Sequence, residues 1–369
     1  MHARESGMLM LRTVVFSGLA LLLSACGGKS EEVSQVAPAE AATPKPVAVQ
    51  VDDELSEIRA VLDRFPVKDA AILIGDETGL KHTYAKGELL PGYPLAIASG
   101  SKLIFGAALW KLVNAGDMSP DDHPQDYLSY WSADDPRGEV TLSDLMSLTS
   151  GFNDTREATG CIADTRTNLS DCVRQIYEYG LQAQPGETFS YGLNHLQIAA
   201  AMMAQASSAT PPDAIQSLIF DPLEMGWATE FPDAYLDNSA YAASMVTSPE
   251  DYGRFLTALL AGDLISDMDG FLKVRAGKDV PGNRWNGWEY GWGFWIECTP
   301  ETSEDCTAPL ISSPGALGFL PWVDFAEGYW AVIAMQEEPS GRYEPVKASI
   351  ELEQELQPLI AELMNSDHS

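Results

Sequence analysis

The chain carries a serine and a lysine three residues apart, Ser99 and Lys102, and this pair could perform nucleophilic chemistry. The residues before Ser99 predict a short strand, and those after it predict a helix rich in Ala and Leu. Side chains at positions i and i+3 of a helix lie on one face, so the lysine amine would reach the serine hydroxyl. A neutral amine there can take the hydroxyl proton, and a helix N-terminus favours the negative charge that develops. The pattern therefore indicates a serine acyl-transfer enzyme that needs no histidine base.

A plainer interpretation of this pair is equally consistent with the local sequence. One Ser-x-x-Lys arises by chance at roughly even odds in a chain with this many serines and lysines. Ser99 would then be a helix N-cap, and Lys102 a solvated lysine one turn later. Other segments of the chain decide between the two interpretations.

The elements expected around the pair predict an α/β fold. Helices are expected over residues 53–65, 99–114, 142–148, 169–177, 195–204, 213–220, 249–260 and 346–364. Strands are expected over residues 70–74, 81–86, 288–297, 316–323 and 329–335. Because strands occur near both ends of the chain, they would share one antiparallel β-sheet flanked by helices, with an inserted all-helical domain. A cleft between two such parts is a favoured place for a small ligand.

Four segments further along the chain carry an ordered set of motifs. They are VTLSDLMSLTSGF at 140–152, PGETFSYG at 185–192, DPLEMG at 221–226 and the stretch from Tyr241 to Phe255. Together with the Ser-x-x-Lys pair they resemble the serine β-lactamase-like hydrolases, a group of class C β-lactamases, penicillin-binding proteins and family VIII-type carboxylesterases. The resemblance covers most of residues 65–340 and implies a β-lactamase/transpeptidase-like fold.

This resemblance implies a role for each matching residue. Ser99 corresponds to the nucleophile, Lys102 to the lysine that activates it, and Tyr191 to the tyrosine that shares proton transfer with that lysine. The backbone N–H groups of Ser99 and Ala316 correspond to an oxyanion hole. The resemblance implies no cofactor and no metal. A buried loop tyrosine that only holds a backbone carbonyl is the alternative for Tyr191.

The chain departs from the family pattern at two candidate substrate-binding positions. Asn194 falls one position later than the asparagine of the Tyr-x-Asn motif, and it could instead cap a helix beginning near His195. The third motif reads Ser-Pro-Gly-Ala at Ser313, Gly315 and their neighbours, without the usual cation. Since that cation helps to hold a substrate carboxylate, its loss weakens the case for β-lactams or D-Ala-D-Ala termini and favours neutral acyl substrates.

These features predict a serine hydrolase that cleaves an ester or amide bond of a small molecule through an acyl-enzyme. A β-lactamase or D-alanyl-D-alanine carboxypeptidase-like activity is one alternative. A non-catalytic, penicillin-binding-like protein that binds peptidoglycan or a protein is another, although such a binder would not need the Ser-Lys-Tyr set.

Composition excludes several other classes of function. The formal net charge of −32 disfavours binding to nucleic acid or to anionic lipid surfaces. The sequence contains no Gly-x-Ser-x-Gly and only five histidines, which argues against a Ser-His-Asp hydrolase. It contains no His-Glu-x-x-His, which argues against metal-dependent hydrolysis.

The first 25 residues predict a lipoprotein signal peptide. Arg4 and Arg12 precede an apolar stretch from Val14 to Leu23, which is too short to cross a bilayer. The ending Leu-Ser-Ala-Cys resembles a bacterial lipobox, which implies cleavage before Cys26 and lipidation of that thiol. An ordinary secretory signal is the alternative.

The composition after Cys26 predicts a tether and then one folded domain. Residues 26–50 are rich in Ala, Pro, Val and Glu, as in disordered linkers. The hydrolase domain is expected over 51–366, with its α/β part at about 51–100 and 283–366 and its helical part at about 101–282. Because Gly27 is not the aspartate that retains lipoproteins at the inner membrane, we expect an outer-membrane lipoprotein of the cell envelope that faces the periplasm, with the membrane contacted by its lipid anchor only.

The remaining four cysteines form two close pairs. In an exported protein, this arrangement favours the disulfides Cys161–Cys172 and Cys298–Cys306 over a zinc site. Most of the tryptophans in the last third of the chain are expected to fill the core of the sheet, although they could instead line the cleft. These are Trp285, Trp288, Trp292, Trp295 and Trp322.

Overall fold

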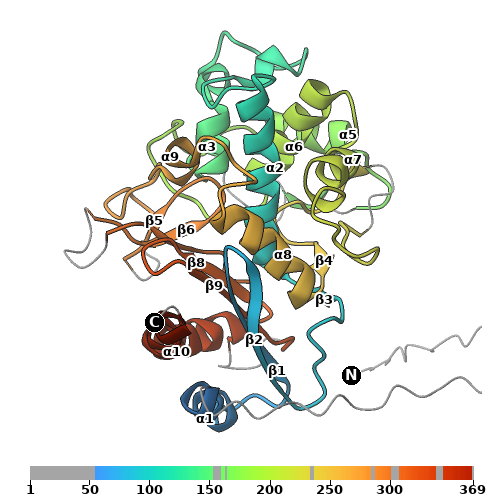
Figure 1. Ribbon diagram of the computed structural model, residues 1–369. Coiled ribbons are helices and arrows are strands. Elements are labelled where there is room, and N and C mark those ends of the chain that lie inside the picture. The colour runs from blue at the N-terminus through green and yellow to red at the C-terminus, as the bar shows by residue number, and fades with distance from the viewer. Residues whose placement is uncertain are drawn as a thin grey trace, which may run out of the picture. The chain divides into compact units, whose positions relative to one another are not determined.

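An antiparallel sheet of seven strands brings the two ends of the folded chain together (Figure 1), as the sequence predicts. This computed structural model describes residues 55–152, 159–162, 164–232, 237–283, 287–300, 307–337 and 344–367. The strand order is β2-β1-β9-β8-β7-β6-β5. The strands are β1 Ala70–Asp76, β2 Gly79–Lys86, β5 Glu289–Tyr290, β6 Trp295–Cys298, β7 Leu310–Ser312, β8 Leu320–Asp324 and β9 Tyr329–Ala334.

The central strands β1 and β9 come from opposite ends of the chain. They pair antiparallel, with Ala71 opposite Ala334 and Leu73 opposite Val332. Every residue of both strands is buried. Such continuous apolar strands belong in the middle of a sheet that is covered on both faces.

Helices cover both faces of the sheet (Figure 1). Helices α1 (Ser56–Arg64) and α10 (Pro345–Asp367) lie together on one face, and α8 (Pro249–Leu260) packs on the other. Helix α1 buries one apolar face, with Ile58, Val61 and Leu62 inside. Helix α8 begins as its sequence predicts, with Ser248 accepting a hydrogen bond from the Asp251 N–H and Pro249 in the first turn.

The middle of the chain supplies a helical part. Its helices are α2 Ser101–Ala115, α3 Leu142–Met146, α5 Leu169–Tyr179, α6 Asn194–Ser207, α7 Pro211–Ile215 and α9 Met268–Leu272. In place of the helix predicted over 213–220, α7 ends at Ile215 and is followed by one π-helical turn over Gln216–Phe220. Cys161 and Cys172 form the predicted disulfide, which joins the loop before α5 to its first turns.

Two of the predicted strands differ in the structure: one is split in two and the other is shorter than expected. The expected strand over 288–297 consists of β5 and β6, because residues 291–294 turn inward and the Gly293 N–H donates to the Met146 carbonyl. The expected strand over 316–323 begins only at Leu320, since the chain turns at Gly315 and Gly318. Strand β7 was not predicted.

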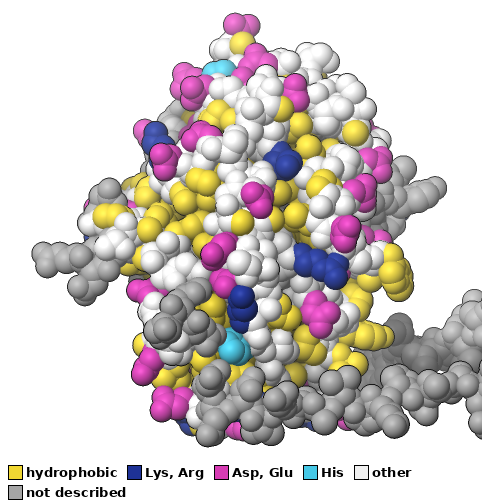
Figure 2. All heavy atoms as spheres, in the orientation of Figure 1, with side chains coloured by type: hydrophobic (Ala, Val, Ile, Leu, Met, Phe, Trp, Pro, Cys, Tyr) yellow, Lys and Arg dark blue, Asp and Glu magenta, His cyan; other side chains and the backbone are white. Residues whose placement is uncertain are grey.

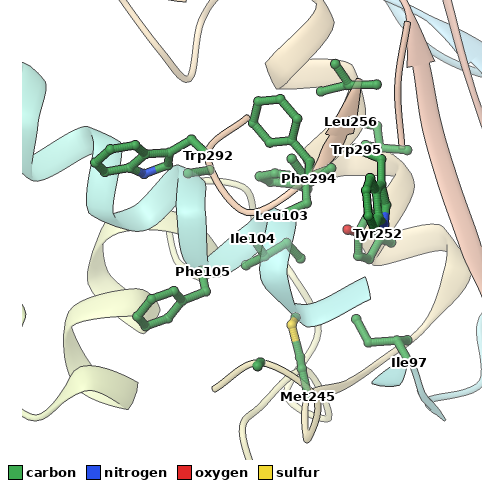
Figure 3. Packing of buried hydrophobic residues seen from close by; sticks show 14 of the residues in the cluster. Ile97, Leu103, Ile104, Phe105, Met245, Tyr252, Leu256, Trp292, Phe294 and Trp295 are labelled. Atoms are coloured by element: carbon green, nitrogen blue, oxygen red, sulfur yellow. The ribbon is translucent and has the colours of Figure 1, made fainter. Parts of the chain in front are cut away.

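Helix α2 runs through the centre of the molecule and is buried on nearly all sides. A helix that is apolar all round must be enclosed by other elements. Trp292 and Phe294 lie on one side of its first turns, and Ile97 and Met245 lie on the other (Figure 3). Gly106 permits this packing, because a Cβ there would lie 2.4 Å from the Trp292 carbonyl oxygen.

The surface is strongly acidic. Figure 2 shows Asp and Glu spread over the visible face, with Lys and Arg in a few isolated places. Among the described residues, no helix is long and apolar enough to cross a bilayer.

Candidate active site

Ser99 lies in a tight turn directly before the buried helix α2. Strand β3 (Leu95–Ala96) pairs with β4 (Val246–Thr247), and a single 3₁₀ turn over Ala98–Gly100 then leads into α2. Ala98 has a φ of 47°, in the left-handed region that a residue with a Cβ seldom adopts. Strained backbone of this kind persists only where neighbours hold it, and it is common beside reactive groups.

Three consecutive carbonyl groups of this turn each accept a hydrogen bond from a hydroxyl. Ser101 Oγ donates to the Ala98 oxygen at 2.6 Å. Ser313 Oγ donates to the Ser99 oxygen at 2.9 Å, and Tyr252 Oη donates to the Gly100 oxygen at 2.8 Å. The donors come from α2, the segment after β7 and α8, so three separate elements fix the backbone of the nucleophile.

Tyr252 is a dependable donor in this arrangement. Its ring is completely buried, against Phe255 and Phe319. Burial raises the pKa of Tyr252 well above 10, because the charged phenolate would lose its hydration. Its hydroxyl therefore keeps its proton, and this role of Tyr252 was not predicted from the sequence.

Lys102 points at the Ser99 hydroxyl from inside the protein. Only 1% of the lysine surface is exposed, and its Nζ lies 3.0 Å from Ser99 Oγ. The same Nζ donates to the Ala242 carbonyl at 2.9 Å and lies 4.5 Å from the centre of the Tyr191 ring. The structure thus excludes the solvated lysine of the plainer interpretation. The i, i+3 spacing places amine and hydroxyl in contact, as predicted.

Tyr191 lies at the open side of this pair, with 43% of its surface exposed. Its ring stacks parallel to Trp295, with 5.7 Å between ring centres. Lys102 meets the face of the ring, and within the described part of the chain the Tyr191 hydroxyl makes no hydrogen bond. That hydroxyl is therefore available to a bound molecule, and the alternative of a tyrosine that holds a backbone carbonyl does not apply.

His195 supports the segment that carries Tyr191. It is fully buried, its Nε2 lies 2.8 Å from the Ser190 carbonyl oxygen, and its Nδ1 lies 2.8 Å from Ser150 Oγ. Because both ring nitrogens contact protein groups, His195 positions the loop and takes no direct part in the cavity.

A cavity of about 330 Å³ opens beside Ser99. Ser99, Tyr191 and Ala316 line it on the side of the reactive groups. Phe189, Trp295, Pro314, Gly282 and Val346 form the rest of its lining. Trp295 therefore belongs to the cleft, whereas Trp288, Trp292 and Trp322 are buried in the core, and Trp285 lies outside the described residues.

Ala316 lines the same cavity as Ser99, where the predicted oxyanion hole requires it. Gly315 allows this segment to lie close to the backbone of Ile97, since a Cβ at position 315 would lie 2.2 Å from the Ile97 carbonyl oxygen. Its N–H donates to the Phe319 carbonyl at 2.7 Å, which closes the turn. Among the described residues no hydrogen bond uses the Ala316 N–H, so it can serve a substrate oxygen.

Three residues predicted as substrate-binding candidates lie outside the cavity lining. Ser313 is buried and donates to Ser99 itself. Gly315 packs against Ile97, as described above. Asn194 is buried, 1% exposed, as the first residue of α6. It is not the N-cap either, because Leu193 occupies that position. For Ser313 and Gly315, contacts with the distant turn around Ser99 decide the outcome, and the local sequence does not encode them.

Some predicted residues lie outside the described part of the chain. These are Cys26, with the signal peptide and tether, and Cys306. Cys298 is disulfide-bonded, and its predicted partner is Cys306. The described residues contain no group of three or more His, Cys, Asp or Glu side chains that could hold a metal ion.

Sequence comparison places this geometry in context. The family model described as Beta-lactamase matches residues 90–355. Protein flp of Staphylococcus aureus (strain N315) is 24% identical over 127 residues, which are 34% of this chain and 26% of that protein. The chain therefore spans about a quarter of the length of this curated relative.

Two solved structures share the fold at low sequence identity. EstCE1, a hydrolase with promiscuous acyltransferase activity, has a TM-score of 0.67 and 15% identity, covering 84% of this chain and 98% of that chain. The D-amino acid amidase from Ochrobactrum anthropi SV3 has a TM-score of 0.65 and 16% identity, covering 82% of this chain and 99% of that chain. At such identities the likeness establishes the fold alone.

Proposed function

The chain belongs to the beta-lactamase family, and from that premise we propose that it is a serine hydrolase that cleaves an ester or amide through a Ser99 acyl-enzyme. One observation carries the proposal: Lys102 Nζ lies 3.0 Å from Ser99 Oγ, within the protein and at the edge of a cavity. A serine hydroxyl is a weak nucleophile until a base takes its proton, and this amine is in reach to do so.

The reaction proceeds in two steps. Ser99 Oγ attacks the substrate carbonyl carbon while its proton passes to the Lys102 amine, and the carbonyl oxygen becomes an oxyanion facing the Ala316 and Ser99 N–H groups. The proton then passes to the leaving group, with the Tyr191 hydroxyl at the open side as its carrier, and the leaving group departs. Water attacks the acyl-enzyme by the reverse route, which restores Ser99 and releases the acid.

The same family fold hosts more than one acyl substrate. EstCE1 is a hydrolase and the Ochrobactrum protein is an amidase by their descriptions. We propose an uncharged ester or amide for this chain, because the third motif has Ser313 in place of a cation and directs its hydroxyl to the Ser99 backbone. β-Lactams and D-alanyl peptides carry a carboxylate that this arrangement does not meet.

We further propose that the enzyme is an exported lipoprotein of the bacterial envelope, anchored by Cys26 at the outer membrane and facing the periplasm. The lipobox-like sequence and the disulfide Cys161–Cys172 support this location. Incorporation of radiolabelled palmitate into the wild type and not into Cys26→Ser tests the anchor.

The acyl-enzyme is tested with a fluorophosphonate, a probe that phosphonylates activated serines. Intact mass spectrometry should show one adduct on the folded wild-type domain and none on Ser99→Ala. An adduct on the variant would place the nucleophile elsewhere. A folded wild type without an adduct would overturn the proposal in favour of a protein that only binds its ligand.

A further inference from the structure

The cavity beside Ser99 has an open side and a closed end. Tyr191 is 43% exposed at the open side, whereas Phe189 and Trp295 at the closed end are 5% and 4% exposed. The leaving group and the attacking water must exchange with solvent, so they belong at the open side with Tyr191. The acyl group stays covalently attached after the leaving group departs, so it belongs at the closed end.

The closed end is built from flat rings in fixed positions. Trp295 packs edge-on against Tyr290 at 4.8 Å between ring centres, and at a tilt against Phe189 at 5.6 Å. Phe189 is fixed through its backbone, since its N–H donates to the Pro281 carbonyl at 2.8 Å. Gly282 is needed for this contact, because a Cβ there would lie 2.0 Å from the Phe189 carbonyl oxygen. These rings therefore present a preformed surface to an incoming group.

The described lining of the closed end also carries no charged side chain. Among the described residues, no Lys, Arg, His, Asp or Glu side chain lines the cavity. Among the described residues, Lys102 is the cation beside this cavity, and its amine contacts Ser99 and the Ala242 carbonyl and is covered by the Tyr191 ring. A carboxylate placed at the closed end would lose its hydration and find no cation among the described lining residues, which is strongly unfavourable.

We propose that this cavity is an acyl pocket for an uncharged aryl group, so that the preferred substrates are esters or amides of arylacetic-type acids. The proposal rests on the acyl-enzyme function above and adds the part of the substrate that the protein selects. The volume of about 330 Å³ is at the small end of ligand pockets, which suits an acyl group of about one ring. Flat rings against Trp295 and Phe189 gain both apolar contact and aromatic packing.

Four p-nitrophenyl esters with one shared leaving group test this pocket: acetate, cyclohexylacetate, phenylacetate and para-carboxyphenylacetate. For the wild type we expect kcat/KM to rise about tenfold or more from acetate to phenylacetate. We expect phenylacetate to exceed cyclohexylacetate by about threefold, since only the flat ring packs on the aromatic surface. The carboxylated ester should fall about 100-fold below phenylacetate, because its charge is buried without a partner.

Two variants remove or change the closed end. Trp295→Ala should bring the ratio of phenylacetate to acetate close to one, while Trp295→Phe retains most of it. Trp288→Ala is the matched control: Trp288 packs on Trp295 at 6.2 Å between ring centres but is not part of the cavity lining. A control variant that loses the ratio to the same extent would overturn the assignment of Trp295 as the selecting surface.

A second variant keeps the test decisive if Trp295→Ala does not fold. Val346 lines the cavity at the start of α10, so Val346→Lys should raise kcat/KM for the carboxylated ester about tenfold. Gln354→Lys adds the same charge at an exposed position of the same helix and should not change this value. Equal effects of the two lysines would contradict the pocket assignment.

The esters also separate this proposal from the function on which it rests. If the fluorophosphonate labels Ser99 and acetate is hydrolysed, but phenylacetate is no better than acetate, the aryl pocket is wrong and the hydrolase function stands. If Ser99 is not labelled and no ester is hydrolysed by the folded protein, the hydrolase function itself fails.

Discussion

The turn that carries Ser99 and the closed end of the cavity are held in place by different forces. In the turn, the carbonyl groups of Ala98, Ser99 and Gly100 each accept a directed hydrogen bond from a hydroxyl. At the closed end, the Trp295 ring is placed by packing against Phe189 and Tyr290. Hydrogen bonds fix distances to a few tenths of an ångström, whereas packing fixes shape. The chemistry of this protein therefore depends on the hydrogen-bonded turn, while its specificity can change through the packed closed end of the cavity.

The largest expected loss comes from the base at the turn. Lys102→Met keeps an unbranched side chain that stops short of the amine position, and so removes the proton acceptor 3.0 Å from Ser99 Oγ. We expect kcat for p-nitrophenyl acetate to fall about 1,000-fold or more, within the range of general acid–base effects. Stopped-flow or steady-state release of p-nitrophenolate measures the change, with a thermal melt to show that the variant is folded. A loss smaller than tenfold would mean that another group activates Ser99.

Tyr191 belongs to both regions, and one substitution tests the role of its hydroxyl apart from the role of its ring. Tyr191→Phe retains the ring that stacks on Trp295 and covers Lys102. We expect kcat to fall about 100-fold through loss of the proton carrier, while the ratio of phenylacetate to acetate stays as in the wild type. If the ratio fell while kcat did not, the hydroxyl would serve substrate binding and not proton transfer.

Ser313 tests the hydrogen bonds of the turn. Ser313→Ala removes the donor to the Ser99 carbonyl, 2.9 Å away. The loss of one hydrogen bond is worth about 1 kcal/mol, so we expect kcat to fall about fivefold with KM unchanged. Ser312→Ala is the neighbouring control, since no described hydrogen bond joins Ser312 to the turn. An increase in KM with constant kcat would return Ser313 to the substrate-binding role that its sequence position predicts.

A smaller effect is expected on the stability of the protein, and it comes from two buried carboxyl groups. The Glu297 carboxyl on β6 faces Ser312, Gln357 and Glu353, and burial raises its pKa from 4.5 to about 8. Burial, and then the charge of Glu297, raises the pKa of Glu353 as well. The folded protein therefore keeps protons that the unfolded chain releases, and the free energy of unfolding should fall as the pH rises from about 4.5 to about 8.

The matched variants are Glu297→Gln and Glu351→Gln. The first removes an ionisation that differs between folded and unfolded protein, so the fall in the free energy of unfolding between pH 5 and 8 should become smaller. The second removes an exposed carboxylate of α10 and should leave the slope unchanged. Urea unfolding at several pH values measures both, and equal slopes in the wild type and Glu297→Gln would contradict a buried, protonated carboxyl.

The sequence predicts the contacts that are local and those that follow from hydrophobic patterning. Ser99 and Lys102 meet because they are one helical turn apart, and β1 and β9 share the middle of the sheet because both are buried and, except for Asp76, apolar. The break between β5 and β6 was not predictable, since it depends on the Gly293 N–H finding the Met146 carbonyl. The role of Ser313 was not predictable either, because its partner Ser99 lies 214 positions away in the sequence.

The most direct test of the central claim is to trap the acyl-enzyme during turnover. The domain is mixed with p-nitrophenyl phenylacetate, quenched in acid within milliseconds to seconds, and examined by intact mass and peptide mapping. We expect a burst of p-nitrophenolate of up to one equivalent and a phenylacetyl group on the peptide that contains Ser99. Hydrolysis without a burst or an adduct, or an adduct on another residue, would contradict it.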